Sequence, residues 1–269
     1  MSRALLLICA TLAAATSRGD ENPAPAPPAP RDLARELLGR EVYLRACVAC
    51  HGDHGDGKGP GARRLDPLPR DFTLGVYKFR STASGSLPLL DDVVRTISAG
   101  VPGTSMPSWA NLLSEDERRA VADYVLGFSP RYHEEPLSER IVPPLAALRP
   151  LPATGARLAH GKALYKAAGC IECHGPLGRG DGRAAKGLKD ETGRPIRPLD
   201  FSRGFYKGGS TPGDVYRTFI TGLDGTPMPS FASALPDEED RWSLVHYVRS
   251  LSRPRGIWSW LFGLQTPWE

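Results

Sequence analysis

Apolar residues recur at helical spacing in two separate stretches of the chain. They are Leu33, Leu37, Leu38 and Val42 in the first stretch, and Ala163, Leu164, Ala167 and Ala168 in the second. Apolar positions three to four residues apart fall on one face of a helix. No alternating apolar and polar pattern of useful length indicates a strand. The pattern therefore predicts an all-α fold with long irregular connections.

Two further helices are indicated by the residues that would begin them. Ser114 and Glu117 form a capping box ahead of "RRAVADYVLGF". Pro236 and the acidic run at 237–240 precede "RWSLVHYVRSL". Acidic side chains favour the positive end of the helix dipole, so this run marks a helix start. Each half of the chain is thus expected to end in a closing helix.

The chain contains two copies of one unit. "GREVYLRACVACHG" from Gly39 corresponds to "GKALYKAAGCIECHG" from Gly161, and "DFTLGVYK" corresponds to "DFSRGFYK". "GTSMPSW" at 103–109 likewise corresponds to "GTPMPSF" at 225–231. His51 precedes Met106 by 55 residues, and His174 precedes Met228 by 54. Positions shared by both copies are the candidates for shared chemistry.

The copies differ in two internal spacings. From the histidine to the Asp of the DF pair there are 20 residues in the first copy and 26 in the second. From Lys78 to Arg95 there are 17 residues, whereas from Lys207 to Arg217 there are 10. We expect these stretches to be tolerant surface loops. Each unit is predicted to run helix, CxxCH, glycine-rich loop, short helix, methionine loop and closing helix.

The length of 269 residues suits two domains of about 100 residues each. Residues 1–17 have a positively charged start and a short apolar run, typical of a secretory signal peptide, and Cys9 would leave with it. A Pro-rich tether at 18–32, a first domain at 33–132, a Pro-rich linker at 133–155, a second domain at 156–253 and a Trp-rich tail at 254–269 follow. We expect a periplasmic or otherwise exported protein.

The remaining cysteines form two pairs, Cys47 with Cys50 and Cys170 with Cys173. In an exported chain a disulfide framework is one explanation, and a zinc site is another. Neither explains why a histidine directly follows each pair. The net charge of +4 is modest and spread along the chain, and no basic run with interleaved aromatics favours nucleic acid as a partner.

The pattern Cys-x-x-Cys-His is typical of covalent c-type haem attachment. Two thiols bond the porphyrin, and the adjacent histidine is placed as an axial ligand of the iron. The sequence therefore predicts two c-type haems, attached through the cysteine pairs and ligated by His51 and His174. Met106 and Met228, each in a matching downstream loop, are predicted as the opposite axial ligands. Met/His ligation belongs to the cytochromes c and raises the iron's potential.

With these motifs, each unit resembles a class I cytochrome c domain, and the whole resembles exported two-haem cytochromes built from tandem class I units. The resemblance covers residues 33–130 and 156–252. It implies that the first and closing helices cross at four positions, with Tyr124 and Tyr247 as aromatic partners. Those positions are Gly39 and Tyr43 in the first unit, and Gly161 and Tyr165 in the second.

The resemblance also implies a proline carbonyl that accepts a hydrogen bond from the axial histidine. Pro60 fits in the first unit, but Arg183 stands at about that place in the second. Because such bonds set the basicity of the ligand, we expect the potentials of the two haems to differ.

Several polar residues recur in both units: Lys78 and Lys207, Arg95 and Arg217, Tyr77 and Tyr206. The cations either pair with haem propionates, for which arginine is well suited, or are solvated beside packed tyrosines. The other histidines do not recur, which disfavours bis-histidine ligation. They are His54, His133, His160 and His246.

Three functions fit this pattern. The leading hypothesis is an electron carrier that exchanges single electrons with exported or membrane-bound redox proteins. A di-haem enzyme, such as a peroxidase or a sulfur-compound dehydrogenase, is the alternative, although the mature chain offers no cysteine outside the two motifs. The third is a carrier permanently docked as the cytochrome subunit of an oxidoreductase complex. The tail either packs back onto the domains or serves as an aromatic patch for a partner or the membrane interface.

Overall fold

The computed structural model of the chain describes residues 32–252, which belong to one compact unit. The predicted signal peptide, all of the tether but its last residue, and the Trp-rich tail lie outside the described residues. No helix in the described part of the chain is long and apolar enough to cross a membrane.

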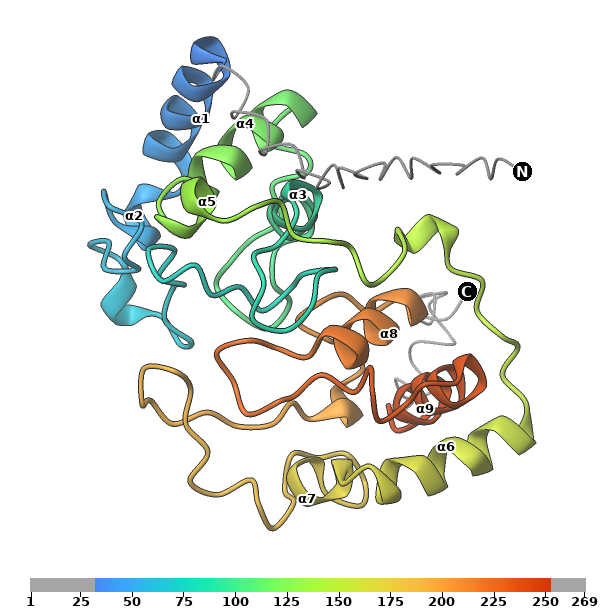
Figure 1. Ribbon diagram of the computed structural model, residues 1–269. Coiled ribbons are helices and arrows are strands. Elements are labelled where there is room, and N and C mark those ends of the chain that lie inside the picture. The colour runs from blue at the N-terminus through green and yellow to red at the C-terminus, as the bar shows by residue number, and fades with distance from the viewer. Residues whose placement is uncertain (1–31, 253–269) are drawn as a thin grey trace, which may run out of the picture. The chain divides into compact units, whose positions relative to one another are not determined.

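The predicted all-α fold is confirmed, because residues 32–252 contain helices and isolated bridges but no strand. The first half contains α1 (Leu33–Ala46), α2 (Val48–His51), the 3-10 turn η1 (Ala62–Arg64), α3 (Leu90–Ala99), α4 (Glu115–Leu126) and α5 (Arg131–Glu134). The second contains η2 (Leu145–Ala147), α6 (Gly155–Ala167), α7 (Cys170–His174), η3 (Phe201–Arg203), α8 (Pro212–Thr221) and α9 (Glu238–Ser250). The order of the main helices thus repeats (Figure 1).

The predicted start signals begin the closing helices. The Ser114 hydroxyl accepts from Glu117 N at 3.2 Å, and the Glu117 carboxylate accepts from Ser114 N at 2.7 Å. In the second half, α9 begins after Asp237 with three acidic residues in its first turn. The bonds at Ser114 satisfy N–H groups that have no partner within the helix, whereas the acidic residues of α9 favour the positive end of its dipole.

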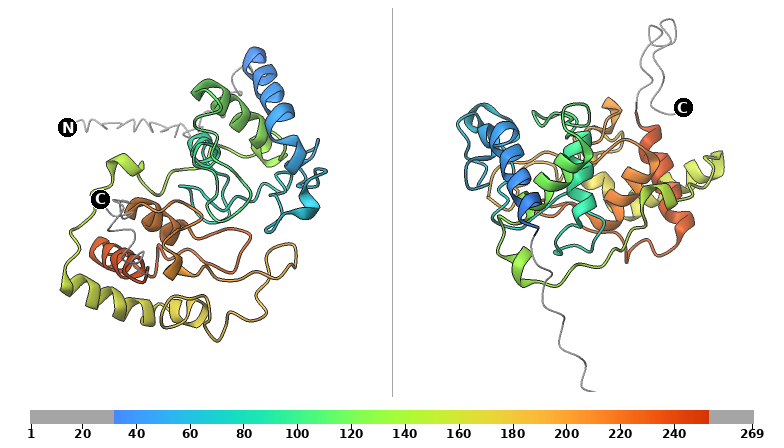
Figure 2. Two further views of the ribbon diagram at one scale, coloured as in Figure 1. Left: turned by 180° about the vertical axis from the view of Figure 1, so that it is seen from behind. Right: turned by 90° about the horizontal axis from the view of Figure 1, so that it is seen from above.

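The first and closing helices of each half cross where the resemblance placed them. α1 packs on α4, and α6 packs on α9, as both views in Figure 2 show. A Cβ atom on Gly39 would lie 2.3 Å from the Ala120 carbonyl oxygen, so only glycine admits this approach. The ring centroids of Tyr43 and Tyr124 are 5.4 Å apart, and those of Tyr165 and Tyr247 are 5.3 Å apart. The prediction of glycine and tyrosine at both crossings is confirmed.

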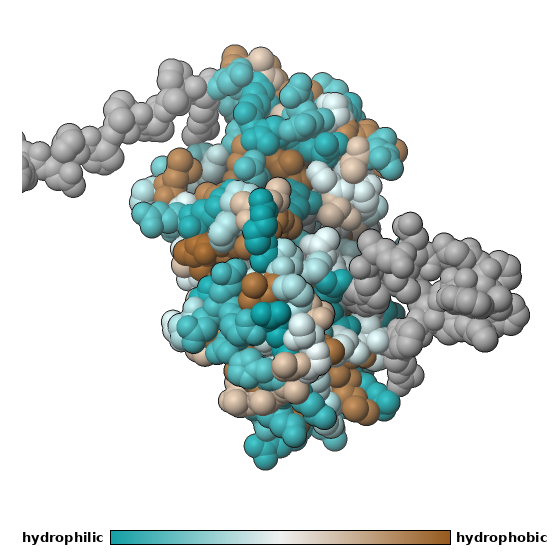
Figure 3. Space-filling view, turned by 90° about the vertical axis from the view of Figure 1, so that its right-hand side faces the viewer, coloured by the Kyte–Doolittle hydropathy of each residue, from teal (hydrophilic) through white to brown (hydrophobic). Residues whose placement is uncertain are grey.

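Each half has its own hydrophobic core. Val42, Tyr43 and Val121 are fully buried in the first, and Trp242, Leu244 and Val245 are fully buried in the second. Val142 and Leu148, from the predicted linker, pack into the second core. Figure 3 shows hydrophilic residues over most of one face, with hydrophobic residues in small separate patches.

One predicted surface loop is partly buried, which corrects the expectation drawn from its variable length. In the longer stretch after Lys78, the side chains of Arg80, Ser81 and Thr82 are 0 to 1% exposed. Arg80 bonds the carbonyl of Thr221 in the second half at 2.6 Å. The extra residues therefore make contacts between the halves, which the spacing alone did not reveal.

Gly39→Ala and Gly161→Ala are each expected to lower the free energy of unfolding by about 1–3 kcal/mol, because the added methyl group must displace a helix backbone. At Gly161 the new atom would lie 2.0 Å from the Ser243 carbonyl oxygen. Denaturant unfolding measures the change. Gly155→Ala is the control, since no other described residue lies within 4 Å of its Cβ position. Stability equal to wild type in all three variants would contradict the close approach.

Candidate functional site

The predicted site residues of the first half line one cavity. Cys47, Cys50, His51 and Met106 all border a space of about 410 Å³. Its walls are mainly apolar and include Leu65, Leu68, Phe72, Ile97 and Trp109. The structure therefore brings together residues that are separated by up to 59 positions in the sequence.

The cysteine pair and histidine occupy a short helical turn after the first helix of each half. Cys47 ends α1, and α2 runs to His51, whereas α7 spans the whole second motif. Cys47, Cys50, Cys170 and Cys173 form no disulfide with one another. Burial raises the pKa of Cys47 and of Cys170 to about 11. The Tyr43 hydroxyl donates to Gly52 O at 2.7 Å and the Tyr165 hydroxyl to Gly175 O at 2.8 Å, which ties each turn to its helix crossing.

The hydrogen-bond partner expected for the histidine was wrong. His51 Nδ1 lies 3.2 Å from the Arg70 carbonyl oxygen, not from that of Pro60. His174 Nδ1 lies 3.1 Å from the equivalent carbonyl of Leu199. Each acceptor directly precedes the Asp of the DF pair. Because both halves use the same partner, Arg183 in place of proline gives no reason for two different potentials.

The two Asp-Phe pairs, Asp71–Phe72 and Asp200–Phe201, orient the side chains of these histidines. Asp71 accepts from Thr73 N at 2.9 Å, and Asp200 accepts from Ser202 N at 3.0 Å, which fixes the turn after each acceptor carbonyl. Phe72 stacks on His51 with ring centroids 4.5 Å apart. The sequence analysis did not assign this role, although the repetition of "DF" in both copies was its signal.

The stacking partner in the second half is Phe201, whose ring centroid lies 4.3 Å from that of His174. Burial lowers the pKa of both histidines. The imidazoles are therefore neutral, and with Nδ1 donating to a carbonyl, Nε2 keeps its lone pair for a metal.

The two methionine loops have the same internal hydrogen bonds. Val101 N donates to Met106 O and Leu223 N to Met228 O, both at 3.1 Å. The amide of each methionine donates to a threonine hydroxyl at 3.2 Å. Each loop follows a glycine with positive φ, where a Cβ atom would meet the backbone of the proline after the methionine. This close approach turns the chain sharply between the helix and the methionine.

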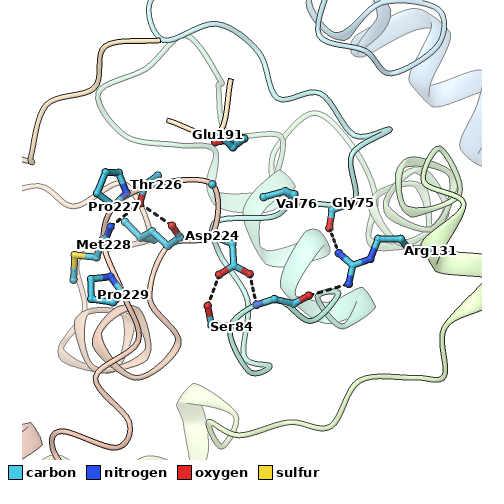
Figure 4. A pocket seen from close by; sticks show the side chains of 13 residues that line it. Gly75, Val76, Ser84, Arg131, Glu191, Asp224, Thr226, Pro227, Met228 and Pro229 are labelled. Carbon is cyan, nitrogen blue, oxygen red and sulfur yellow. Dashed lines mark hydrogen bonds between the residues drawn. The ribbon is translucent and has the colours of Figure 1, made fainter. Parts of the chain in front are cut away.

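In the second half, Cys170 and Met228 both pack against the core cluster of that half. Met228 also lines a second cavity, of about 390 Å³, together with Gly75, Val76 and Arg131 of the first half (Figure 4). The second methionine loop therefore borders the other half of the chain.

Two arginines shared by the copies lack an acceptor for part of their guanidinium groups. Arg95 pairs with Asp92 at 2.9 Å and Arg217 with Asp214 at 3.0 Å. Arg95 Nη2 and Arg217 Nη1 are buried without a hydrogen-bond partner among residues 32–252. Burial, and secondarily the charge of Arg95, lowers the pKa of Arg217 to about 10. A buried donor without an acceptor is costly, so an anionic group of a ligand fits here.

Two lysines show the same need for an anion. Lys78 and Lys207, one from each half, both line the first cavity. Burial lowers the pKa of Lys78 to about 8, and it also lowers that of Lys207. Tyr77 and Tyr206 belong to the cores, with hydroxyls 3.4 and 3.3 Å from backbone carbonyls.

The remaining histidines lie elsewhere. His54 is exposed, His160 pairs with Asp240 at 2.6 Å, and His246 bonds the Leu151 carbonyl at 2.6 Å. The residues present therefore fit a covalently bound haem: paired thiols, a neutral histidine and an apolar cavity, with cations suited to two propionates.

Comparison with known proteins agrees with this fit. Residues 34–125 match the family described as cytochrome c oxidase, cbb3-type, subunit III, and residues 158–252 match the family described as cytochrome c. Cytochrome c55X of Paracoccus denitrificans is 33% identical over 97 residues, which cover 36% of this chain and 78% of that protein.

Two further relatives belong to larger assemblies by name. The Cbb3-type cytochrome c oxidase subunit CcoP of Rhodobacter capsulatus is 33% identical over 103 residues. That match spans 36% of this chain and 30% of the subunit. A solved chain of the Kuenenia stuttgartiensis reducing HAO-like protein complex Kustc0457/Kustc0458 is 45% identical, with a TM-score of 0.75. The match covers 80% of this chain and 96% of that one.

With a CxxCH motif and an apolar core in each half, and with a cytochrome c family model matched in each, the chain belongs to the cytochrome c family and is a two-haem c-type cytochrome of two tandem domains.

Proposed function

We propose that this protein transfers single electrons between exported redox partners through two haems, each ligated by one histidine and one methionine. The observation that carries the proposal is the first cavity, which Cys47, Cys50, His51 and Met106 border together. The repeat supplies the same four residue types in the second half. When bound, the haem supplies one-electron chemistry at its iron.

The chain's own residues would perform four tasks. The cysteine pairs would tether the ring, and Nε2 of His51 or His174 would bind the iron. The sulfur of Met106 or Met228 would bind it as well, which would close the site to substrates. The buried cations pair with propionates, for which the unpartnered N–H groups of Arg95 and Arg217 have the right chemistry.

The comparisons favour the subunit form of this function over a free shuttle. One relative is named as a subunit of an oxidase, and another was solved as part of a reducing HAO-like protein complex. We propose that this chain likewise docks to a partner oxidoreductase and relays its electrons. Export after removal of residues 1–17 remains part of the proposal. Loss of the partner on purification without loss of the haems would favour the free shuttle.

Met106→His and Met228→His test the ligation. Each variant is expected to lower one of the two reduction potentials by on the order of 0.1 V or more, because a thioether ligand favours the reduced iron. A spectroelectrochemical titration of the purified holoprotein measures both potentials. Leu137→His is the control, since Leu137 is 88% exposed. Two potentials unchanged in a methionine variant would show that this methionine is no ligand.

Arg95→Gln tests the proposed pairing with a propionate. At least one potential is expected to fall by tens of millivolts, where about 59 mV corresponds to a tenfold change for a one-electron couple. Removing the cation, and leaving Asp92 uncompensated, favours the more positive oxidised iron. Arg183→Gln serves as the matched control, because the Arg183 side chain is 85% exposed. Equal potentials in both variants and wild type would indicate a solvated or purely structural Arg95.

A further inference from the structure

The two length differences between the copies converge on the second methionine loop, residues 222–229. The first copy is seven residues longer between its lysine and arginine, with 17 against 10. That stretch contains Arg80, Ser84 and Gly85, all of which bond residues at or beside this loop. The second copy is six residues longer between its histidine and Asp, with 26 against 20, and that stretch contains Glu191.

Arg80 is buried at the contact between the two domains. Its Nη2 lies 2.8 Å from Asp224 Oδ1 and 2.6 Å from the Thr221 carbonyl oxygen, both in the second domain. Its Nε and Nη1 donate to the carbonyls of Ala83 and Tyr77 at 3.0 and 3.2 Å. The guanidinium group is therefore bonded to both domains, and its side chain is 0% exposed.

Asp224 is held from a second direction. The Ser84 hydroxyl donates to Asp224 Oδ1 at 2.7 Å, and Gly85 N donates to Oδ2 at 2.8 Å (Figure 4). Arg131 in turn donates to the carbonyls of Gly75 and Gly85 at 3.0 and 2.8 Å, which steadies the donor segment. We call Arg80, Ser84, Gly85 and Asp224 the interdomain clasp.

Glu191 holds the next residue of the same loop. Its backbone N–H donates to the Gly225 carbonyl at 3.2 Å, and a Cβ atom on Gly225 would lie 2.4 Å from its carboxylate. That carboxylate pairs with Arg70 of the first domain. Two consecutive residues, three and four positions before Met228, are thus fixed from outside the loop.

Among residues 32–252, the first methionine loop has no such clasp. Pro102 stands where the second loop has Asp224, and Gly209 stands where the first domain has Arg80. Phe205 of the second domain packs on Gly103 instead, where an added Cβ atom would lie 2.4 Å from its ring. Because the internal hydrogen bonds of the two loops are alike, the loops differ in their outside contacts: an aromatic ring at the first loop, and Glu191 with the clasp at the second.

We propose that Arg80 and Asp224 are positioning residues, which hold Met228 at its iron from the opposite haem domain. This inference rests on the proposed methionine ligation. A glycine-flanked loop loses conformational entropy when it is ordered, and the clasp supplies contacts that offset this loss before the ligand bond forms. Opening the loop would leave a buried arginine without its carboxylate, which is strongly unfavourable. Ligation of the second iron therefore depends on this buried ion pair between the domains, which has no counterpart at the first methionine loop.

Asp224→Pro tests this with a residue that the chain already uses in the first loop, at Pro102. The internal loop geometry is thereby kept while the clasp is removed. Imidazole is added to the oxidised holoprotein, where it competes with the methionine for each iron. NMR follows this replacement separately at each haem. The second haem is expected to bind imidazole at least about tenfold more tightly than in wild type, with the first unchanged. Ser84→Ala, which removes one exposed hydrogen bond, should shift the same haem in the same direction by less.

Asp237→Asn is the matched control, because Asp237 is exposed and its side chain makes no capping bond. Wild-type imidazole affinity in Asp224→Pro and Ser84→Ala would overturn the positioning role while leaving methionine ligation intact. An equal gain in imidazole affinity at both haems would also overturn it, because a general loss of stability explains that result. If the second haem of the wild-type protein shows no NMR resonance of a bound methionine, Met228 is not a ligand, and the proposed role of the clasp is refuted with it.

Discussion

A hydrogen bond between a histidine Nδ1 and a backbone carbonyl fixes the orientation of the imidazole in each haem site. The acceptors are Arg70 and Leu199, each held by the turn that the following aspartate caps. The phenylalanine after that aspartate stacks on the imidazole. This arrangement fixes which nitrogen can bind a metal and the plane in which it lies. Every other proposed ligand has to be brought to that position by the fold.

The helix crossings and methionine loops bring the other residues into place. Tyr43 and Tyr165 connect each crossing to the glycine that follows the histidine. The close approach at Gly39 and Gly161 sets how near the closing helix lies. On the other side, a sharp turn at a positive-φ glycine directs each methionine loop back from α3 or α8. Local backbone chemistry is thus the same in both domains, as expected for two sites with the same ligands.

The contacts between the two domains affect the two haem sites differently. Buried cations of one copy act on those of the other: after burial, the charge of Arg95 lowers the pKa of Arg217, and the charge of Lys207 is a lesser cause of the lowered pKa of Lys78. Anionic propionates would relieve that repulsion and connect the stability of each site to its neighbour. The clasp adds a one-sided dependence, because Arg80 and Asp224 have no counterparts in the other copy. Two sites with similar ligands can therefore respond differently to changes at the domain contact.

The repeat and the helical periodicity of the sequence predicted the helices and their order. The all-α fold and the capping box at Ser114 follow from short-range rules and were confirmed. The crossings at Gly39 and Gly161 were implied by the resemblance to class I cytochrome c domains and were also confirmed. Pro60, implied by the same resemblance, was wrong as the histidine's partner, because the acceptor carbonyl belongs to the repeated DF turn.

The contact between Arg80 and Asp224 could not be predicted from the repeat. It joins positions 144 residues apart that are not shared by the copies, and the length differences around it suggested tolerant loops. Such a pair depends on how the two domains pack, which neither periodicity nor local motifs determine.

An optically monitored redox titration of the exported, purified protein tests the central claim most directly, with full spectra recorded at each potential. The account predicts two one-electron steps at relatively high potential, with both irons low-spin throughout and haem retained after denaturation. A strongly negative step, or an iron that becomes high-spin or exchanges its ligand on reduction, would contradict it. That outcome would favour a di-haem enzyme over an electron carrier.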